Sequence, residues 1–181
     1  MSLTDSQLYD LSKKMNFPLE RVCFKDELDD EPLVYNKGYI VNMEDEYDAN
    51  GYLNSGSHWV AFQVNKNPNG TIEKMFFDSY GKPPAVAIEK YTGKIPYSTK
   101  NIQSAMSDVC GWFCCAFLHW INAYDGRTRH FYTDCENFLE LFLNLDESSD
   151  WKQNEYMLKN FFRSSDPSLR KEINVWNSQT I

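Results

Sequence analysis

The chain has 181 residues, of which 42% are hydrophobic and 15% aromatic, so it holds enough apolar side chains to build a folded core. Its formal net charge of −8 disfavours nucleic acid as a partner, because affinity for a phosphate backbone comes from Lys and Arg. No apolar stretch is long enough to span a bilayer, and the first residues lack the basic and apolar segments of a secretory signal. We therefore expect an intracellular protein without a membrane partner, with one domain over residues 1–181.

Five cysteines are present, an odd number, and three of them crowd one short segment. This pattern does not resemble the disulfide framework of a small secreted protein. We expect free thiols in a reducing compartment, where a thiol nucleophile stays reduced. The cysteines are Cys23, Cys110, Cys114, Cys115 and Cys135.

The first element expected is a helix over residues 5–15. Thr4 is a suitable N-cap, with Gln7 three residues later as its capping-box partner, and Pro18 marks the end. Residues 19–57 predict loops with short extended pieces, of which 39–41 is the best strand candidate.

A hairpin is expected next. Residues 59–64 form an apolar strand run, 65–70 are a turn cluster, and 72–78 resume the extended pattern. A short helix is expected from 84 or 85 to 91.

The second half of the chain predicts helices. The segment 111–124 is apolar nearly all round, which is typical of a helix buried in a core. Amphipathic helices are expected at about 134–145, capped by Thr133, and at about 151–162, capped by Asp150, before a polar surface arm at about 164–181. This order of elements predicts an α+β fold, in which a sheet packs against the central buried helix.

Cys110 is a candidate nucleophile because it stands at the start of that buried helix. A helix N-terminus carries partial positive charge and free N–H groups, which favour a thiolate and can stabilise an oxyanion. Gly111 lets the backbone approach a substrate carbonyl, so the backbone of Cys110 and Gly111 is the expected oxyanion site. Its position alone, however, is more typical of a small core residue.

His58 is the best candidate for the general base among three histidines, because it directly precedes an apolar strand. We expect His119 to be a core residue of the buried helix and His130 to face solvent. If 59–64 and 72–78 pair, Asp78 lies beside His58 and can orient its imidazole, although it could also cap the following turn. Gln103, seven residues before Cys110, could donate to an oxyanion or be an ordinary loop residue.

Four segments together resemble the adenain-like family, the adenovirus maturation proteases. They are Gly56-Ser-His-Trp-Val-Ala-Phe, Phe77-Asp-Ser-Tyr-Gly, Gln103, and Cys110-Gly-Trp-Phe-Cys-Cys-Ala-Phe-Leu-His. The order His, acid, Gln, Cys also resembles the ubiquitin-like-protein proteases, and the likeness covers about residues 4–122. The sequence looks closest to the family members of virophages and Polinton-type elements.

The resemblance implies a papain-related cysteine protease fold, with His58, Asp78, Gln103 and Cys110 as the catalytic residues. It implies an endopeptidase that cleaves capsid or core precursors at glycine-containing sites during virion maturation, inside the host cell and the virion. No metal or other cofactor is expected, and a peptide activator is a further partner that the family implies.

Two departures from the family pattern concern the acid and the activator. Asp78 stands where adenain has a glutamate, as it does in the ubiquitin-like-protein proteases. Adenain binds its activating peptide through a cysteine upstream of the glutamine, whereas the only such cysteine here is Cys23, so activation through a disulfide is doubtful.

The substrate groove is expected beside His58, lined by Gly56, Ser57 and Trp59, although Trp59 could instead be a core residue. Three other functions compete with a maturation protease. A deconjugase for ubiquitin-like modifiers would use the same residues, and a scaffold protein could use the same fold without a reactive thiol. A zinc site would need ligands from Cys110, Cys114, Cys115 and His119, but a helix directs these around its circumference rather than toward one point.

Overall fold

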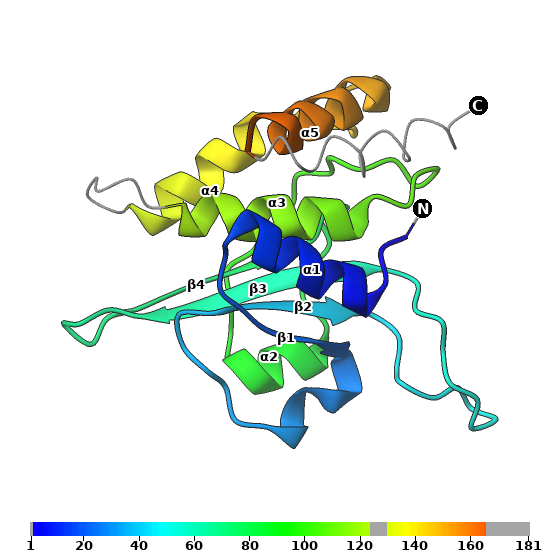
Figure 1. Ribbon diagram of the computed structural model, residues 1–181, viewed down its shortest axis with the longest axis vertical. Helices are drawn as coiled ribbons and strands as arrows, with labels where there is room; N and C mark the ends of the chain where they lie inside the picture. The colour runs from blue at the N-terminus through cyan, green and yellow to red at the C-terminus, as the bar shows by residue number, and fades with distance from the viewer. Residues whose placement is uncertain (1, 124–129, 166–181) are drawn as a thin grey trace.

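The computed structural model describes residues 2–123 and 130–165. Helices and strands alternate irregularly along the chain, which gives an α+β class with one mixed sheet (Figure 1). The elements are α1 (Asp5–Met15), β1 (Leu19–Phe24), the 3₁₀ helix η1 (Lys25–Asp30), β2 (Gly38–Asn42), β3 (Trp59–Lys66), β4 (Ile72–Phe77), α2 (Val86–Thr92), α3 (Cys110–Asn122), α4 (Phe131–Glu140) and α5 (Trp151–Ser165).

The sheet has four strands in the order β1-β2-β3-β4. β1 pairs with β2 in parallel, and the other two pairs are antiparallel. The β3–β4 hairpin is as predicted, and its register sets Ala61 opposite Phe77. This register brings the residues just before β3 and just after β4 to the same end of the sheet.

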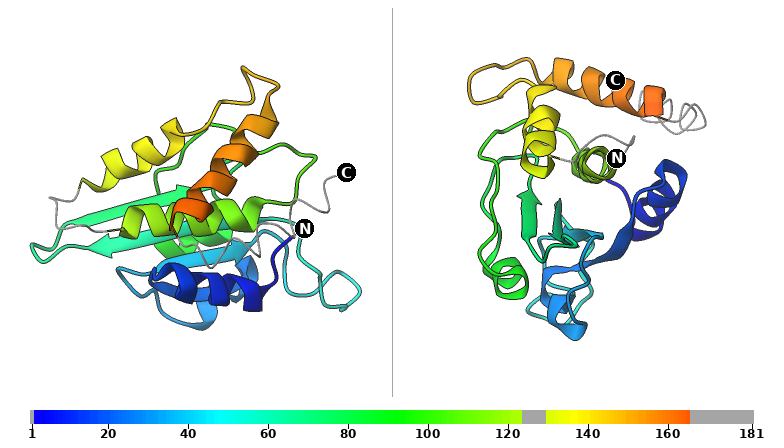
Figure 2. Two further views of the ribbon diagram at one scale, coloured as in Figure 1. Left: turned by 45° about the horizontal axis from the view of Figure 1, so that its top comes forward. Right: turned by 90° about the vertical axis from the view of Figure 1, so that its left-hand side faces the viewer.

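Helix α3 is the buried helix that the sequence predicts. Ten of its residues are buried, and it packs against β3 (Figures 1 and 2). Helices α1, α4 and α5 surround it on one side of the sheet, while η1 and α2 cover the other side. Strand residues alternate between the two cores, as in Val60 and Ala61, because successive side chains point to opposite faces.

The local signals at the N-terminus are confirmed. The Thr4 side chain accepts from the backbone N–H of Gln7, and the Gln7 side chain accepts from that of Thr4. At the other end of α1, Asn16 closes the helix in the left-handed conformation, with φ at 54°.

Two segments differ from the prediction. Residues 19–57 contain β1 and η1 in addition to the predicted strand at β2. β1 is stabilised by parallel pairing with β2, a non-local contact that the sequence of β1 does not indicate. Helix α4 begins at Phe131 and not after Thr133, since Phe131 is buried in the core and its burial outweighs the capping preference of Thr133. It ends at Glu140, before the predicted end near residue 145.

The remaining helix ends agree with expectation more closely. The backbone N–H of Gln153 bonds the side chain of Asp150, the predicted cap of α5. Ser164 and Ser165 complete α5, and the rest of the predicted polar arm lies outside the described residues, as does Tyr124 after α3. Within the described ranges, no helix has the length and apolarity that crossing a bilayer requires.

Candidate active site

Cys110 is the first residue of α3 and lies at the sheet end where β3 begins and β4 ends. Val109 precedes it at the N-cap position and has no polar side chain with which to cap the helix. The thiol is 3% exposed, and its Sγ accepts the backbone N–H of Trp59 at 3.4 Å. The nucleophile candidate is therefore held against the strand that follows His58.

His58 contacts both Cys110 and Asp78. Its Nε2 lies 2.8 Å from Oδ1 of Asp78, which leaves Nδ1 as the ring nitrogen for the hydrogen bond with the Cys110 thiol. Burial lowers the pKa of His58, but the hydrogen bonds with Asp78 and Cys110 and the charges of these two groups outweigh it, raising the pKa to about 9. The imidazole is therefore a cation at neutral pH.

Asp78 follows β4 and is 6% exposed. Its Oδ1 also accepts the backbone N–H of Tyr80 at 2.8 Å, which forms a turn completed by a bond from Gly81 N–H to the Asp78 carbonyl. Gly81 has φ of +68°, and a side chain there would collide with the backbone of Thr99. The turn is thus locked, and it fixes the carboxylate toward His58.

Gln103 lies beside this turn, and its backbone N–H bonds the carbonyl of Ser79. Its side chain is 2% exposed and fully engaged: Oε1 accepts from the Ser79 hydroxyl at 2.7 Å, and Nε2 donates to the Ser107 carbonyl at 2.7 Å and to the Tyr80 hydroxyl at 3.2 Å. Both amide hydrogens therefore have acceptors, so direct donation to an oxyanion requires one of these bonds to be released.

The other predicted site residues lie around the thiol in different ways. Ser57 is exposed and Gly56 is half-buried, so both can meet a substrate. Trp59 is 6% exposed, and its indole N–H bonds the Leu3 carbonyl at 2.9 Å, which makes its side chain a core residue. Gly111 is buried with Leu3 and Leu8 against the position of a Cβ, so its small size serves the packing of the N-terminal segment.

Sequence reasoning missed Ser79 and Tyr80. The Tyr80 ring lies 4.6 Å from the His58 ring, between centroids, with 31° between the planes. Burial raises the pKa of Tyr80, and the negative charges of Cys110, Asp78 and Asp108 raise it further. The motif Phe77-Asp-Ser-Tyr-Gly was the signal that could have found them, since a turn directly after a candidate catalytic acid lies at the same centre.

Of the remaining histidines, His130 faces solvent as predicted, whereas His119 is half-buried and not enclosed in the core. Nδ1 of His119 donates to the Met15 carbonyl at 2.9 Å, and burial lowers the pKa of this histidine. His130 is exposed. Cys114 and Cys115 are fully buried, and burial raises the pKa of both thiols. Among residues 2–123 and 130–165, no three His, Cys, Asp or Glu side chains are arranged to hold a metal ion.

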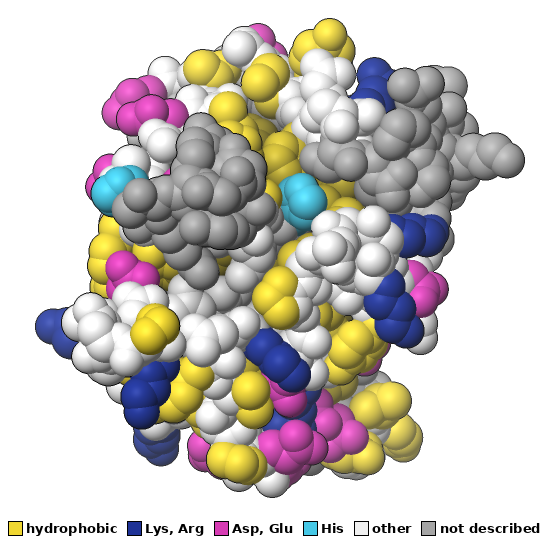
Figure 3. All heavy atoms as spheres, turned by 60° about the vertical axis from the view of Figure 1, so that its left-hand side comes forward, with side chains coloured by type: hydrophobic (Ala, Val, Ile, Leu, Met, Phe, Trp, Pro, Cys, Tyr) yellow, Lys and Arg dark blue, Asp and Glu magenta, His cyan; other side chains and the backbone are white. Residues whose placement is uncertain are grey.

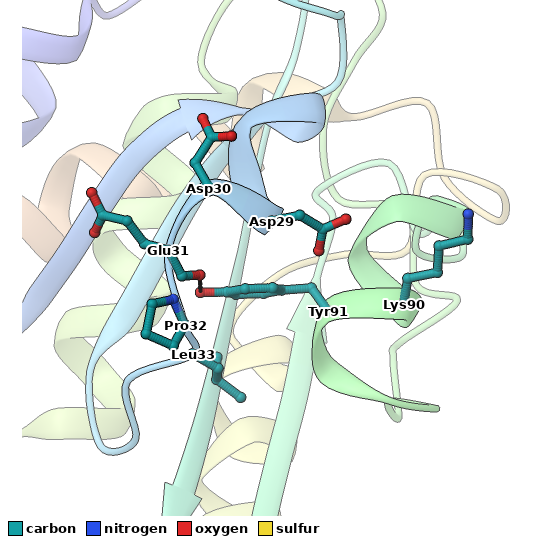
Figure 4. A pocket seen from close by; sticks show the side chains of 7 residues that line it. All are labelled: Asp29, Asp30, Glu31, Pro32, Leu33, Lys90 and Tyr91. Atoms are coloured by element: carbon teal, nitrogen blue, oxygen red, sulfur yellow. Dashed lines mark hydrogen bonds between the residues drawn. The ribbon is translucent and has the colours of Figure 1, made fainter.

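An open pocket of about 490 Å³ lies elsewhere, between η1 and α2 on the opposite side of the sheet from α3 (Figure 4). Figure 3 shows acidic side chains gathered at this lower end of the molecule. The pocket contains neither a thiol nor an imidazole, so it is separate from the site at Cys110. It is lined by Asp29, Asp30, Glu31, Pro32, Leu33, Lys90 and Tyr91.

Comparison with known proteins identifies no family or relative, so the chemistry of the site follows from its own side chains. No family model matches the chain, and no curated protein matches its sequence. The described geometry places a thiol, an imidazole and a carboxylate in one hydrogen-bonded series at a helix N-terminus. Such a series can activate a thiol for attack on a carbonyl carbon.

Proposed function

We propose that this chain is a cysteine endopeptidase of the adenain-like type with a papain-related fold. The observation that carries the proposal is the His58 imidazole, which bonds the Asp78 carboxylate at 2.8 Å through Nε2 and whose pKa is raised by its interactions with both Asp78 and the Cys110 thiol. These are the nucleophile, base and orienting acid that acyl transfer by a thiol requires.

The reaction starts from a Cys110 thiolate and a His58 imidazolium. Sγ attacks the peptide carbonyl carbon, and the carbonyl electron pair moves to oxygen, where N–H groups at the start of α3 stabilise the negative charge. His58 gives its Nδ1 proton to the departing amine as the C–N bond breaks. A water molecule then hydrolyses the thioester, with His58 accepting its proton.

The substrates proposed are capsid or core precursors cut at glycine-containing sites, in the host cell interior and the virion. The motifs around His58 and Cys110 support this class through their likeness to the adenain-like proteases. A peptide activator, if one acts, binds without a disulfide to Cys23, because this thiol is 5% exposed and its burial raises its pKa to about 12.

A second candidate function is the removal of ubiquitin-like modifiers. Asp78 favours it, since the ubiquitin-like-protein proteases resemble this chain in having an aspartate at that position. The chemistry is the same, and the substrate would be a folded modifier that ends in Gly-Gly.

The test is co-expression of the chain with a capsid precursor that carries glycine-rich sites, beside a Cys110→Ala copy, with the cut ends determined by mass spectrometry. Discrete cuts that need Cys110 support the endopeptidase. Without cuts, a modifier carrying a C-terminal vinyl sulfone decides between the alternatives: labelling of Cys110 supports the deconjugase. If the precursor is not cut and the vinyl sulfone does not label Cys110, both functions are contradicted.

A further inference from the structure

Tyr80 lies between the proposed base and the proposed oxyanion residue. Its ring packs on His58 with centroids 4.6 Å apart, and its hydroxyl accepts a hydrogen bond from Nε2 of Gln103 at 3.2 Å. Its own backbone N–H bonds Asp78 at 2.8 Å, so the tyrosine cannot shift without disturbing the acid. Tyr80 thus contacts the proposed base, the proposed acid and Gln103.

The hydrogen bonds around Gln103 leave the hydroxyl hydrogen of Tyr80 available to donate. Both hydrogens of its Nε2 are taken, by the carbonyl of Ser107 and by the hydroxyl of Tyr80. A tyrosine hydroxyl has one hydrogen to donate and lone pairs to accept. Because the Tyr80 oxygen accepts from Gln103, its own hydrogen is available, and it donates to no group within residues 2–123 and 130–165.

The hydroxyl is also aligned by groups that do not move freely. The Ser107 carbonyl can only accept, so its 2.7 Å contact settles which end of the Gln103 amide is Nε2, and the Ser79 hydroxyl then donates to Oε1 at 2.7 Å. The N–H of Gln103 in turn polarises the Tyr80 hydroxyl and makes it a better donor. The Ser79–Gln103–Tyr80 series therefore ends in the O–H group of a tyrosine whose ring packs on His58.

We infer that the Tyr80 hydroxyl is a catalytic oxyanion donor, and that Gln103 acts through it. The inference rests on the proposed function, because it assigns a donor to the acyl transfer at Cys110. When Sγ adds to a carbonyl carbon, the oxygen gains the electron pair of the broken π bond, and the Tyr80 O–H donates to that oxygen without transferring its proton. In the alternative role, the Tyr80 hydroxyl only occupies the Gln103 amide, which would otherwise donate to the oxyanion itself.

Two reagents that react with the same thiol separate these roles. p-Nitrophenyl acetate acylates Sγ: the S–C bond forms, an oxyanion develops, and p-nitrophenolate leaves as the C–O bond breaks. Water then hydrolyses the thioester to acetate. Iodoacetamide alkylates Sγ by displacement of iodide, which forms no oxyanion. A loss confined to acylation therefore reports on the oxyanion donor and not on the thiolate or on folding.

The variant is Tyr80→Phe, which keeps the ring on His58 and removes the hydroxyl, and the matched control is Tyr156→Phe, at an exposed tyrosine of α5. We expect Tyr80→Phe to acylate about 10²-fold more slowly, the effect of losing one oxyanion donor. Its alkylation rate and the alkaline limb of its pH profile should stay unchanged. The double variant with Gln103→Ala should lose little more than Tyr80→Phe alone, because the two residues act in series.

Acylation by Tyr80→Phe at or above the wild-type rate would overturn this inference and leave the proposed function standing, since the freed Gln103 amide would then be the donor. Equal losses in acylation and alkylation would also overturn it, because the tyrosine would act on the thiolate. A wild-type protein whose Cys110 reacts with neither reagent contradicts the proposed function itself, and the inference falls with it.

Discussion

The backbone of Trp59 is bonded on both sides by cysteines of α3. Its N–H donates to Sγ of Cys110 at 3.4 Å, and its carbonyl accepts from Sγ of Cys114, one helical turn later, also at 3.4 Å. Because His58 immediately precedes Trp59, the contact with Cys110 holds the first residue of the helix beside the strand end that carries the imidazole, while the contact with Cys114 packs the helix on the strand. Both cysteines contact the same residue of β3, but only Cys110 interacts with His58, so only Cys110 is placed to act as a nucleophile.

The first prediction compares these cysteines. Cys110→Ala should abolish cleavage and iodoacetamide labelling at the site while leaving the unfolding transition close to that of the wild type. Cys114→Ala removes a fully buried sulfur that His58 does not touch, so it should keep the activity and lose about 1–3 kcal/mol of unfolding free energy. Urea unfolding and turnover measured on the same preparations check both expectations. Loss of activity in both variants, each still folded, would contradict the assignment of the nucleophile.

The second prediction concerns the charge of Asp78. Asp78→Asn keeps the shape of the side chain and removes the carboxylate that helps to raise the pKa of His58 to about 9. The alkaline limb of the pH–rate profile, which reports the Cys110–His58 pair as a unit, should move from about 9 toward 6.5. We also expect kcat/KM to fall by about 10²-fold or more, because the imidazole loses its orienting partner.

The control for this experiment is Asp108→Asn, which removes an exposed acid close enough to affect the pKa of Tyr80 but outside the causes of the raised His58 pKa. Its alkaline limb should stay at the wild-type position. A profile that stays in place in Asp78→Asn would show that the carboxylate does not set the protonation of the base.

Much of the fold follows from local sequence signals. The capping box of Thr4 and Gln7, the β3–β4 hairpin and the all-round apolar character of α3 each depend on neighbours close in the chain. β1 was not predicted because it pairs in parallel with β2 across a connection that contains η1, and no short pattern encodes that pairing. The start of α4 was misjudged because burial of Phe131 is a tertiary effect.

The candidate site likewise has a part that local sequence signals predict and a part that they do not. Cys110, His58 and Asp78 stand at the ends of elements, so a correct hairpin and a correct helix start bring them together. The bonding of Gln103 could not be predicted, because its amide direction depends on Ser79 and Tyr80 in a turn whose geometry is set by Gly81 and the distant Thr99.

The third prediction links stability to the titration of His58. The folded pKa of about 9 lies above the ordinary value of 6.5, so folding takes up protons in this range. The stabilisation is fully present below pH 6.5 and is lost as the pH rises through about 9, with a ceiling of roughly 3 kcal/mol. The difference in unfolding free energy between wild type and His58→Ala should therefore shrink from pH 6 to pH 9.5.

His130→Ala supplies the comparison, since His130 is exposed. Its difference from the wild type should be small at both pH values. A His58→Ala difference that is equal at pH 6 and pH 9.5 would contradict a raised pKa in the folded protein.

The last prediction tests Gly56, two residues before His58. It has φ of +82°, and a Cβ at this position would collide with the side-chain amide of Asn42, which is 2% exposed. Asn42 cannot yield easily, because its Oδ1 accepts the backbone N–H groups of Glu44 at 3.0 Å and Ser57 at 3.3 Å. Gly56→Ala should therefore cost about 1–3 kcal/mol of unfolding free energy and lower kcat by displacing His58.

Gly51→Ala is the matched control in the same connection between β2 and β3. Gly51 has φ of +79°, but nothing lies within 4 Å of the position of its Cβ, so Gly51→Ala introduces the backbone strain without the collision. It should cost about 1 kcal/mol and leave kcat unchanged. If the two variants lose the same stability and the same activity, the contact with Asn42 does not position His58, and the backbone conformation alone explains the glycine.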